Sequence, residues 1–243
     1  MPRRARPPQT TRSEHWMRIA ANEGAAYLNE QIKTVFGWDT EESIEWRSPL
    51  HSDEYAEYYD EDFLERLGVT ALRVPLRGFW PRGGPRWDGL ALTSSGKLIL
   101  VEAKAYPEEG VDFGSQAGPE SIEMIATAME EAKAAFGASE AANWMAPCYQ
   151  YANRLAHLYF LAERNELDAH LIFLYFANAP DVPNPCSVEQ WEGARRLLEK
   201  CVGLPKHHRY SKRIATVVMD VNHLLSNIAS QSDAARRHRL VER

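Results

Sequence analysis

Hydrophobic and polar positions are most clearly patterned between residues 89 and 104. Two apolar segments, 89–92 and 98–101, flank a short polar segment, 93–97, that contains Gly96. Polar residues around a glycine, which can adopt positive φ, are typical of a tight turn. The pattern therefore predicts two antiparallel strands that form a β-hairpin.

The register of this hairpin gathers ionisable side chains at its open end. If the loop has three residues, Thr93 faces Lys97, and counting outward pairs Asp88 with Glu102. Opposed side chains have Cβ atoms about 4.5–5.5 Å apart, so two carboxylates there repel each other unless a cation lies between them. Lys104 follows Glu102 by two positions and therefore emerges on the same face of the strand.

This group of two carboxylates and one ammonium is a candidate metal site. Oxygen ligands without His or Cys favour a hard cation such as Mg²⁺ or Mn²⁺, which can activate water and stabilise charge on a phosphodiester. Lys104 could orient the attacking water. The alternative is an ordinary hairpin with a Glu–Lys pair on a solvated face. The apolar residues around Glu102 favour the first interpretation, because buried charges rarely lack a partner.

The rest of the pattern predicts an α/β domain with a mixed central sheet. Apolar positions near the helical period predict helices at 14–36, 60–67, 120–136, 146–163 and 187–201. Alternating or continuously apolar segments predict further strands at 70–76, 169–176 and 213–221. We expect one domain over 14–225, between a disordered basic tail at 1–13 and a C-terminal tail at 226–243.

The predicted helix at 146–163 carries a polar stripe on an otherwise apolar surface. Gln150, Asn153, Arg154 and His157 follow the spacing i, i+3, i+4 and i+7. Polar groups on a buried helix need partners, which a catalytic pocket would supply. Gln150 and Arg154 could position a phosphate. His157 by itself is more typical of a core histidine.

Two aromatic segments have a second interpretation as binding surfaces. Residues 77–86 combine arginines with Phe79 and Trp80, which suits either base stacking and phosphate contacts or local packing. Residues 38–67 are acidic and aromatic, which suits either a packed surface region or a partner surface. The sequence leaves both pairs of alternatives open.

Composition narrows the functional classes. The 243 residues carry a net charge of −6, which gives no overall attraction to nucleic acid. Three cysteines without CxxC spacing are typical of free thiols in a reducing cytoplasm. No apolar run approaches the roughly 18 residues that a membrane span needs, and no apolar signal segment follows the first residues. We expect a cytoplasmic protein without a membrane partner.

Asp88 followed by Glu102-Ala103-Lys104 resembles the motif of the PD-(D/E)XK nuclease superfamily, which has the restriction-endonuclease-like fold. Trp87 stands where many members have proline. The resemblance implies an α-β-β-β-α-β core. It also implies that Asp88, Glu102 and the backbone carbonyl of Ala103 bind Mg²⁺ or Mn²⁺, while Lys104 assists the nucleophilic water.

The resemblance extends to two flanking helices. In the superfamily, the helix before the sheet often lends a glutamate to the metal, and Glu23 is the candidate here because its small neighbours allow a close approach. A helix after the E-x-K strand often contributes a glutamine, which corresponds to Gln150. Arg154 stands four residues later, where the related pattern has tyrosine.

The sequence thus predicts a metal-dependent nuclease that hydrolyses phosphodiester bonds in DNA. The predicted catalytic residues are Asp88, Glu102, Lys104, Gln150 and Arg154. The alternatives are an inactive nucleic-acid-binding module of the same fold and a hydrolase of small phosphate esters. A homodimer is left open.

Overall fold

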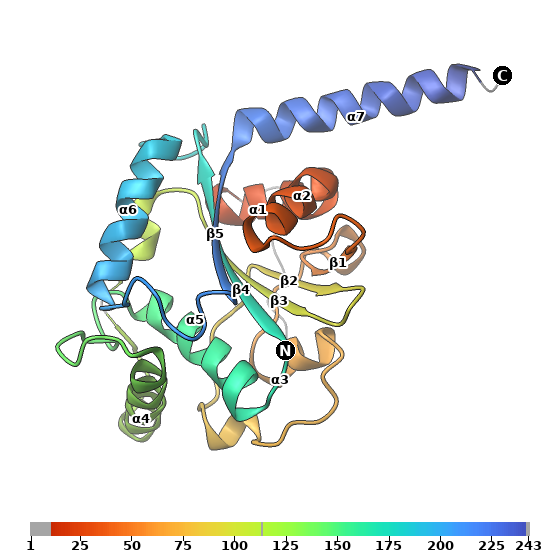
Figure 1. The fold of residues 1–243 in the computed structure, drawn as a ribbon. Helices are drawn as coiled ribbons and strands as arrows, with labels where there is room; N and C mark the ends of the chain where they lie inside the picture. Colours follow the sequence, from red (N-terminus) through yellow and green to blue (C-terminus); the bar gives the residue numbers. More distant parts are fainter. Residues whose placement is uncertain (1–10, 113, 242–243) are drawn as a thin grey trace.

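The computed structural model describes residues 11–112 and 114–241, which form an α/β fold around one five-stranded sheet (Figure 1). The strands are β1 (Ile44–Ser48), β2 (Gly89–Thr93), β3 (Leu98–Lys104), β4 (Ala169–Ala177) and β5 (Ile214–Asp220). The α-helices are α1 (Arg12–Asn22), α2 (Ala25–Phe36), α3 (Asp60–Arg66), α4 (Pro119–Phe136), α5 (Tyr149–Tyr159), α6 (Val188–Cys201) and α7 (Val221–Val241). Short 3₁₀ turns occur at His51–Asp53, Leu76–Gly78 and Pro107–Gly110, and a π-helical turn, Phe160–Arg164, continues α5.

The sheet is open and mixed, and its spatial order is β1-β2-β3-β4-β5. β1, β2 and β3 pair antiparallel, whereas β4 is parallel to β3 and β5 is parallel to β4. The parallel half is connected through helices, as parallel strands require. The predicted fold class, an α/β domain with a mixed sheet flanked by helices, is therefore confirmed.

Both faces of the sheet are covered by helices, and the alternation along β3 shows which side chains face which layer. Leu98 and Leu100 belong to the core beneath α4, α5 and α6. Ile99 and Val101 belong to the core beneath α1, α2 and the start of α7. The two layers lie on opposite sides of the sheet in Figure 1. Glu102 and Lys104 continue the first series, so they face α5.

The hairpin formed by β2 and β3 has the predicted register. Leu90 lies opposite Leu100, and Leu92 lies opposite Leu98. The loop has three residues: the amide of Thr93 donates to the carbonyl of Lys97, and Gly96 has φ +86°. A glycine takes positive φ without a steric penalty, so Gly96 permits a loop of only three residues. This loop length sets the register of the two strands.

The prediction of one helix over 14–36 is wrong at its centre. The structure has two helices, α1 and α2, which meet at Gly24. A Cβ atom on Gly24 would lie 2.4 Å from Cδ1 of Leu224, the buried leucine at the start of α7. The glycine therefore permits the C-terminal helix to approach closely, at the cost of a weaker helix.

One further expectation differs from the structure. Residues 70–76 do not form a strand; Val74 instead donates its amide to the side chain of Asn165, and the third antiparallel strand is β1. Apolar residues of 70–76 still pack against the core, which explains the alternation. Residues 226–241 of the predicted C-terminal tail belong to α7, which extends away from the body of the molecule (Figure 1).

Residues 1–10 of the predicted basic tail lie outside the described residues. None of the helices in the described ranges combines the length and apolar character that a bilayer crossing demands.

Candidate active site

A cavity of about 460 Å³ lies at the open end of the β2–β3 hairpin. Its lining includes all five predicted catalytic side chains, which are Asp88, Glu102, Lys104, Gln150 and Arg154. A larger hollow of about 600 Å³ beside α3 is lined mainly by apolar residues. We place the candidate site in the smaller cavity because buried carboxylates and cations converge there.

Glu102 is held by two cations. Arg154 donates from Nε and Nη2 to Oε2 of Glu102, at 2.6 and 2.5 Å. Lys104 donates from Nζ to Oε1, at 2.5 Å. Burial by itself would raise the pKa of Glu102, whose side chain is only 3% exposed, but Arg154 and Lys104 together lower it. Glu102 is therefore a stable carboxylate.

Asp88 lies just before β2 and is in the opposite electrostatic state. Its Oδ2 accepts a hydrogen bond of 2.7 Å from the amide of Ala103. Burial, followed by the charges of Glu102 and Glu57, raises its pKa well above the ordinary value, and this outweighs the attraction of Lys104. One carboxyl group of the cluster therefore retains its proton more readily than a solvated aspartate does.

Lys104 connects the hairpin to α5. Its ammonium also donates to Oε1 of Gln150, at 3.1 Å. Burial alone would lower the pKa of Lys104, but Glu102 and Asp88 raise it. At neutral pH Lys104 is a hydrogen-bond donor, so it cannot serve as a general base there.

Arg154 is fixed from several sides. In addition to Glu102, it donates from Nη1 to Oδ1 of Asn153 at 2.6 Å and from Nη2 to the carbonyl of Arg86 at 2.8 Å. Its guanidinium carbon lies 5.1 Å from the ring centroid of Trp87. These contacts tie α5 to the segment that leads into β2, and they hold a positive charge at the cavity wall.

Glu57 is a residue of the site that the sequence analysis did not identify. It lines the cavity, is 3% exposed, and its charge contributes to the raised pKa of Asp88. An antiparallel bridge between Tyr58 and Trp87 fixes it there, because the same register sets Glu57 beside Asp88. The acidic character of residues 38–67 was the available signal, but no sequence pattern showed the pairing with Trp87.

Glu23, the fourth predicted metal ligand, is not brought to the cavity. It caps the C-terminal end of α1 and is exposed to solvent. Its small neighbours do permit a close approach, but the group that approaches Gly24 is Leu224. The third acidic residue of the site is Glu57, from a different element.

Several other candidates pack in the core. His157 is 1% exposed, its Nδ1 lies 2.8 Å from the carbonyl of Asn153, and burial lowers its pKa to about 3. It lies among Phe79, Trp80 and Trp87. The core interpretation of His157 and the packing interpretation of Phe79 and Trp80 are both correct, so these two rings are not available for base stacking.

The residues of the cavity fit a hard cation with oxygen ligands. The carboxyl groups of Glu57, Asp88 and Glu102 line the cavity, together with the cations Arg86, Lys104 and Arg154. The N–H and C=O of a strand residue point to the same edge, so the carbonyl of Ala103 faces the side of Asp88. Mg²⁺ is commonly bound by one or two carboxylates with water and substrate. Among the described residues, no cluster of three or more His, Cys, Asp or Glu has the arrangement of a protein-only metal site.

No known family model matches the chain, and neither the curated proteins nor the solved structures include a detectable match.

Proposed function

We propose that the protein is a metal-dependent phosphodiester hydrolase that acts on DNA and belongs to the PD-(D/E)XK superfamily. The observation that carries this proposal is the convergence of Asp88, Glu102 and Lys104 in one cavity with Gln150 and Arg154 on the facing helix. The order of elements from α1 and β1 to β4 supports the restriction-endonuclease-like core that the motif implies.

Asp88, Glu102 and the carbonyl of Ala103 would hold a Mg²⁺ or Mn²⁺ ion. Such an ion supplies charge stabilisation to the phosphodiester and increases the acidity of water. Glu102 would hold the ion with the carboxylate that Arg154 contacts, and the planar donors of the Arg154 guanidinium would bind a phosphate oxygen beside it. Lys104, protonated at neutral pH, orients the water or donates to the developing negative charge.

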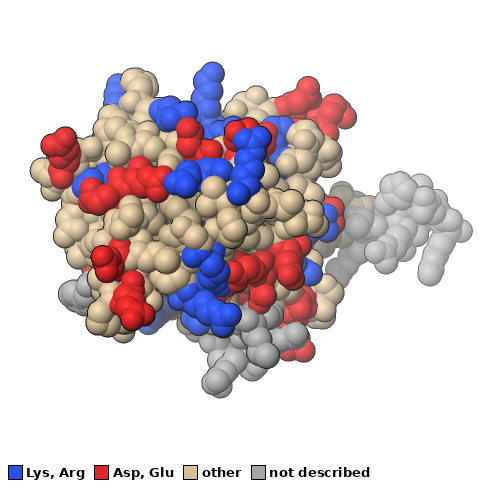
Figure 2. Space-filling model, turned by 90° about the horizontal axis from the view of Figure 1, so that it is seen from below, with Lys and Arg blue, Asp and Glu red and all other residues tan. Residues whose placement is uncertain are grey.

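The charge distribution favours a substrate that is bound mainly at the cavity itself. On the face shown in Figure 2, the described Lys and Arg residues are interspersed with Asp and Glu. The chain as a whole carries a net charge of −6. Because negatively charged residues repel the DNA backbone, we expect the protein to contact only a short stretch of DNA. We also expect it to bind DNA weakly when the divalent cation is absent.

The test is incubation of the purified protein with linear, circular and single-stranded DNA in the presence of Mn²⁺. We expect cleavage that falls by roughly 10²–10⁴-fold in Lys104→Ala and at least as far in Asp88→Asn. Lys97→Ala is the matched control, because Lys97 follows the turn of the same hairpin and lies outside the cavity. Unchanged cleavage in both site variants would refute the proposal.

The same cavity favours one second candidate, a hydrolase of small phosphate esters. The net charge of −6 disfavours a long polyanion more than a short one. Turnover of a short nucleotide ester, with DNA polymers left intact, would select this function. A titration with Mn²⁺ that follows the Tm separates both enzymes from an inactive module that binds no metal. Either enzyme should show a rise in Tm that Asp88→Asn abolishes, because the ion binds in the cavity, whereas the inactive module should show no such rise.

A further inference from the structure

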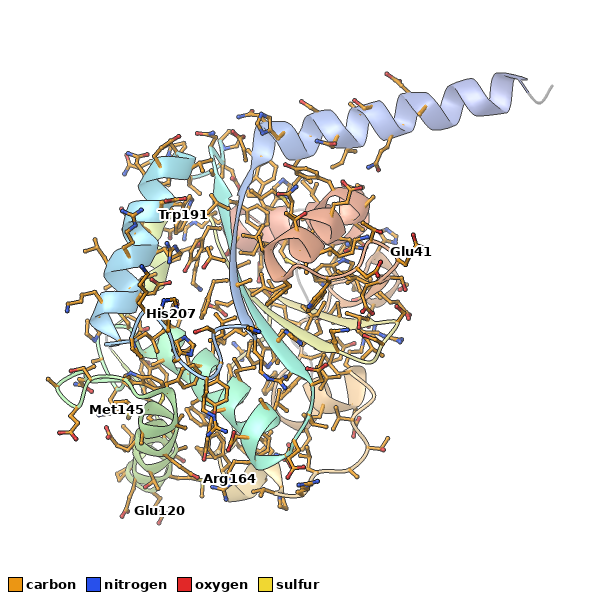
Figure 3. The ribbon with its side chains drawn as sticks, in the orientation of Figure 1. Glu41, Glu120, Met145, Arg164, Trp191 and His207 are labelled. Atoms are coloured by element: carbon orange, nitrogen blue, oxygen red, sulfur yellow. The ribbon has the colours of Figure 1, made fainter. Side chains whose placement is uncertain are left out.

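Two cysteines that are far apart in the sequence meet at the junction of two helices. Sγ of Cys148 lies 2.9 Å from Sγ of Cys201. Cys148 immediately precedes α5, and Cys201 is the last residue of α6. In Figure 3, α6 runs down from labelled Trp191 toward the part of the molecule where Met145 is labelled.

Both cysteines are held in place by the helices that carry them. The carbonyl of Cys148 accepts the amide of Ala152 in the first turn of α5, at 3.0 Å. Trp191 stacks on Tyr175 of β4 with ring centroids 4.4 Å apart and donates to the carbonyl of Phe176, so α6 is anchored on the sheet. The meeting of the two thiols is therefore a property of the packed fold.

We propose that Cys148 and Cys201 are a reversible oxidation site, at which a hydroperoxide converts the two thiols into an intramolecular disulfide. A disulfide has a sulfur–sulfur distance of about 2.05 Å, so the two sulfur atoms need to approach by less than about 1 Å. The helices do not have to separate for the bond to form. This inference does not depend on the proposed function, because it uses only the two thiols.

The exposure of the two thiols gives the order of the steps. Cys148 is 3% exposed, and burial raises its pKa to about 12, so it does not react first as a thiolate. Cys201 is partly exposed. Its sulfur attacks the hydroperoxide, which is reduced to water or an alcohol while Cys201 becomes a sulfenic acid. The sulfur of Cys148 then attacks the sulfur of Cys201, and the hydroxyl group leaves as water with the thiol proton of Cys148.

The disulfide would link the helix that carries Gln150 and Arg154 to α6. Gln150 is two residues after Cys148, and its backbone amide donates to Oδ2 of Asp112 at 2.7 Å. The link closes a long loop between residues 148 and 201, which restricts the unfolded chain. We expect the oxidised protein to have a higher Tm than the reduced protein, by on the order of 5 °C.

The experiment is treatment of the full-length native protein with hydrogen peroxide, followed by denaturation, thiol titration and peptide mapping. We expect the three thiols to decrease to one, a linked pair of peptides that contain Cys148 and Cys201, and full reversal by dithiothreitol. Cys186→Ser is the matched control and should form the same link, because Cys186 lies outside the pair.

The variants test the order of the steps. Cys148→Ser should accumulate a sulfenic acid at Cys201 that a 1,3-dione probe captures, whereas Cys201→Ser should leave Cys148 unlabelled. The proposal is overturned if all three thiols of the wild type persist, if Cys201 proceeds to a sulfinic acid without a link, or if the link joins two chains or involves Cys186. Because the wild-type mapping needs no variant, a variant that fails to fold does not affect this decision.

Discussion

At each end of the β2–β3 hairpin a lysine of the hairpin meets at least one carboxylate, and the two groups differ in how well the carboxylates are satisfied. At the turn, Glu42 accepts hydrogen bonds from Lys97, from the amide of Ser95 and from the hydroxyls of Ser94 and Ser95. Lys97 is the main cause of its lowered pKa. At the open end, Glu102 is equally well paired, but burial and neighbouring acids raise the pKa of Asp88.

This difference separates a structural ion cluster from a candidate functional one. A carboxylate that serves the fold is satisfied by its donors, as Glu42 is, and its ionised form is stable. A site that awaits a ligand retains a group whose ionised form is unfavourable until the ligand arrives. Asp88 has this property, since a bound cation would remove the repulsion that now raises its pKa.

The largest expected effect on stability is at Glu102. Glu102→Ala leaves Arg154 and Lys104 buried without their main counter-charge, and we expect the free energy of unfolding to fall by about 3–5 kcal/mol. Urea denaturation measures this change. The double variant Glu102→Ala/Arg154→Ala should be less destabilised than the sum of its single variants, because the unpaired guanidinium is also removed. An additive result would show that the pair contributes little.

The next effect is at Asp88, and it has the opposite sign. A carboxyl whose pKa is raised on folding stabilises the protein below its unfolded pKa, and this contribution is lost as pH rises through the folded pKa. Each unit by which the pKa is raised corresponds to about 1.4 kcal/mol. The side-chain oxygen of Asn can still accept a hydrogen bond from the backbone amide of Ala103, so Asp88→Asn should stabilise the fold at neutral pH while it lowers the proposed cleavage activity.

The control for this prediction is the pH dependence of stability. The advantage of Asp88→Asn over the wild type should shrink as pH falls below the folded pKa of Asp88 toward the ordinary range of aspartate. Urea denaturation across this pH range gives the curve. An advantage that is constant with pH would mean that the gain comes from packing and that Asp88 carries no unfavourable charge.

The same comparison shows what the sequence could and could not predict. The hairpin and its register follow from local rules, namely the turn chemistry of residues 93–97 and the two-residue period of a strand, so Asp88, Glu102 and Lys104 were found from the sequence. Gln150 and Arg154 were found because a polar stripe on an apolar helix is also a local pattern.

Placements that depend on non-local pairing were missed. Glu57 reaches the cavity through the bridge between Tyr58 and Trp87, which lie far apart in the sequence. Glu23 was chosen for its small neighbours, but Leu224 occupies the space that Gly24 provides. The contact between Cys148 and Cys201 likewise depends on how α5 and α6 pack, which spacing alone does not show.

The smallest expected effect is at Glu42. The side chains of Glu42 and Lys97 are 10% and 20% exposed, against 3% for Glu102 and 7% for Arg154, so solvent screens their attraction more strongly and the serine donors can bind water instead. We expect Glu42→Ala to lower the free energy of unfolding by about 1 kcal/mol. Because the pKa of Glu42 is lowered on folding, its contribution should be present above its unfolded pKa and be lost as pH falls toward its folded pKa. High salt should reduce it further. A loss as large as that of Glu102→Ala would remove the distinction between the two ends of the hairpin, since both clusters would then serve the fold equally.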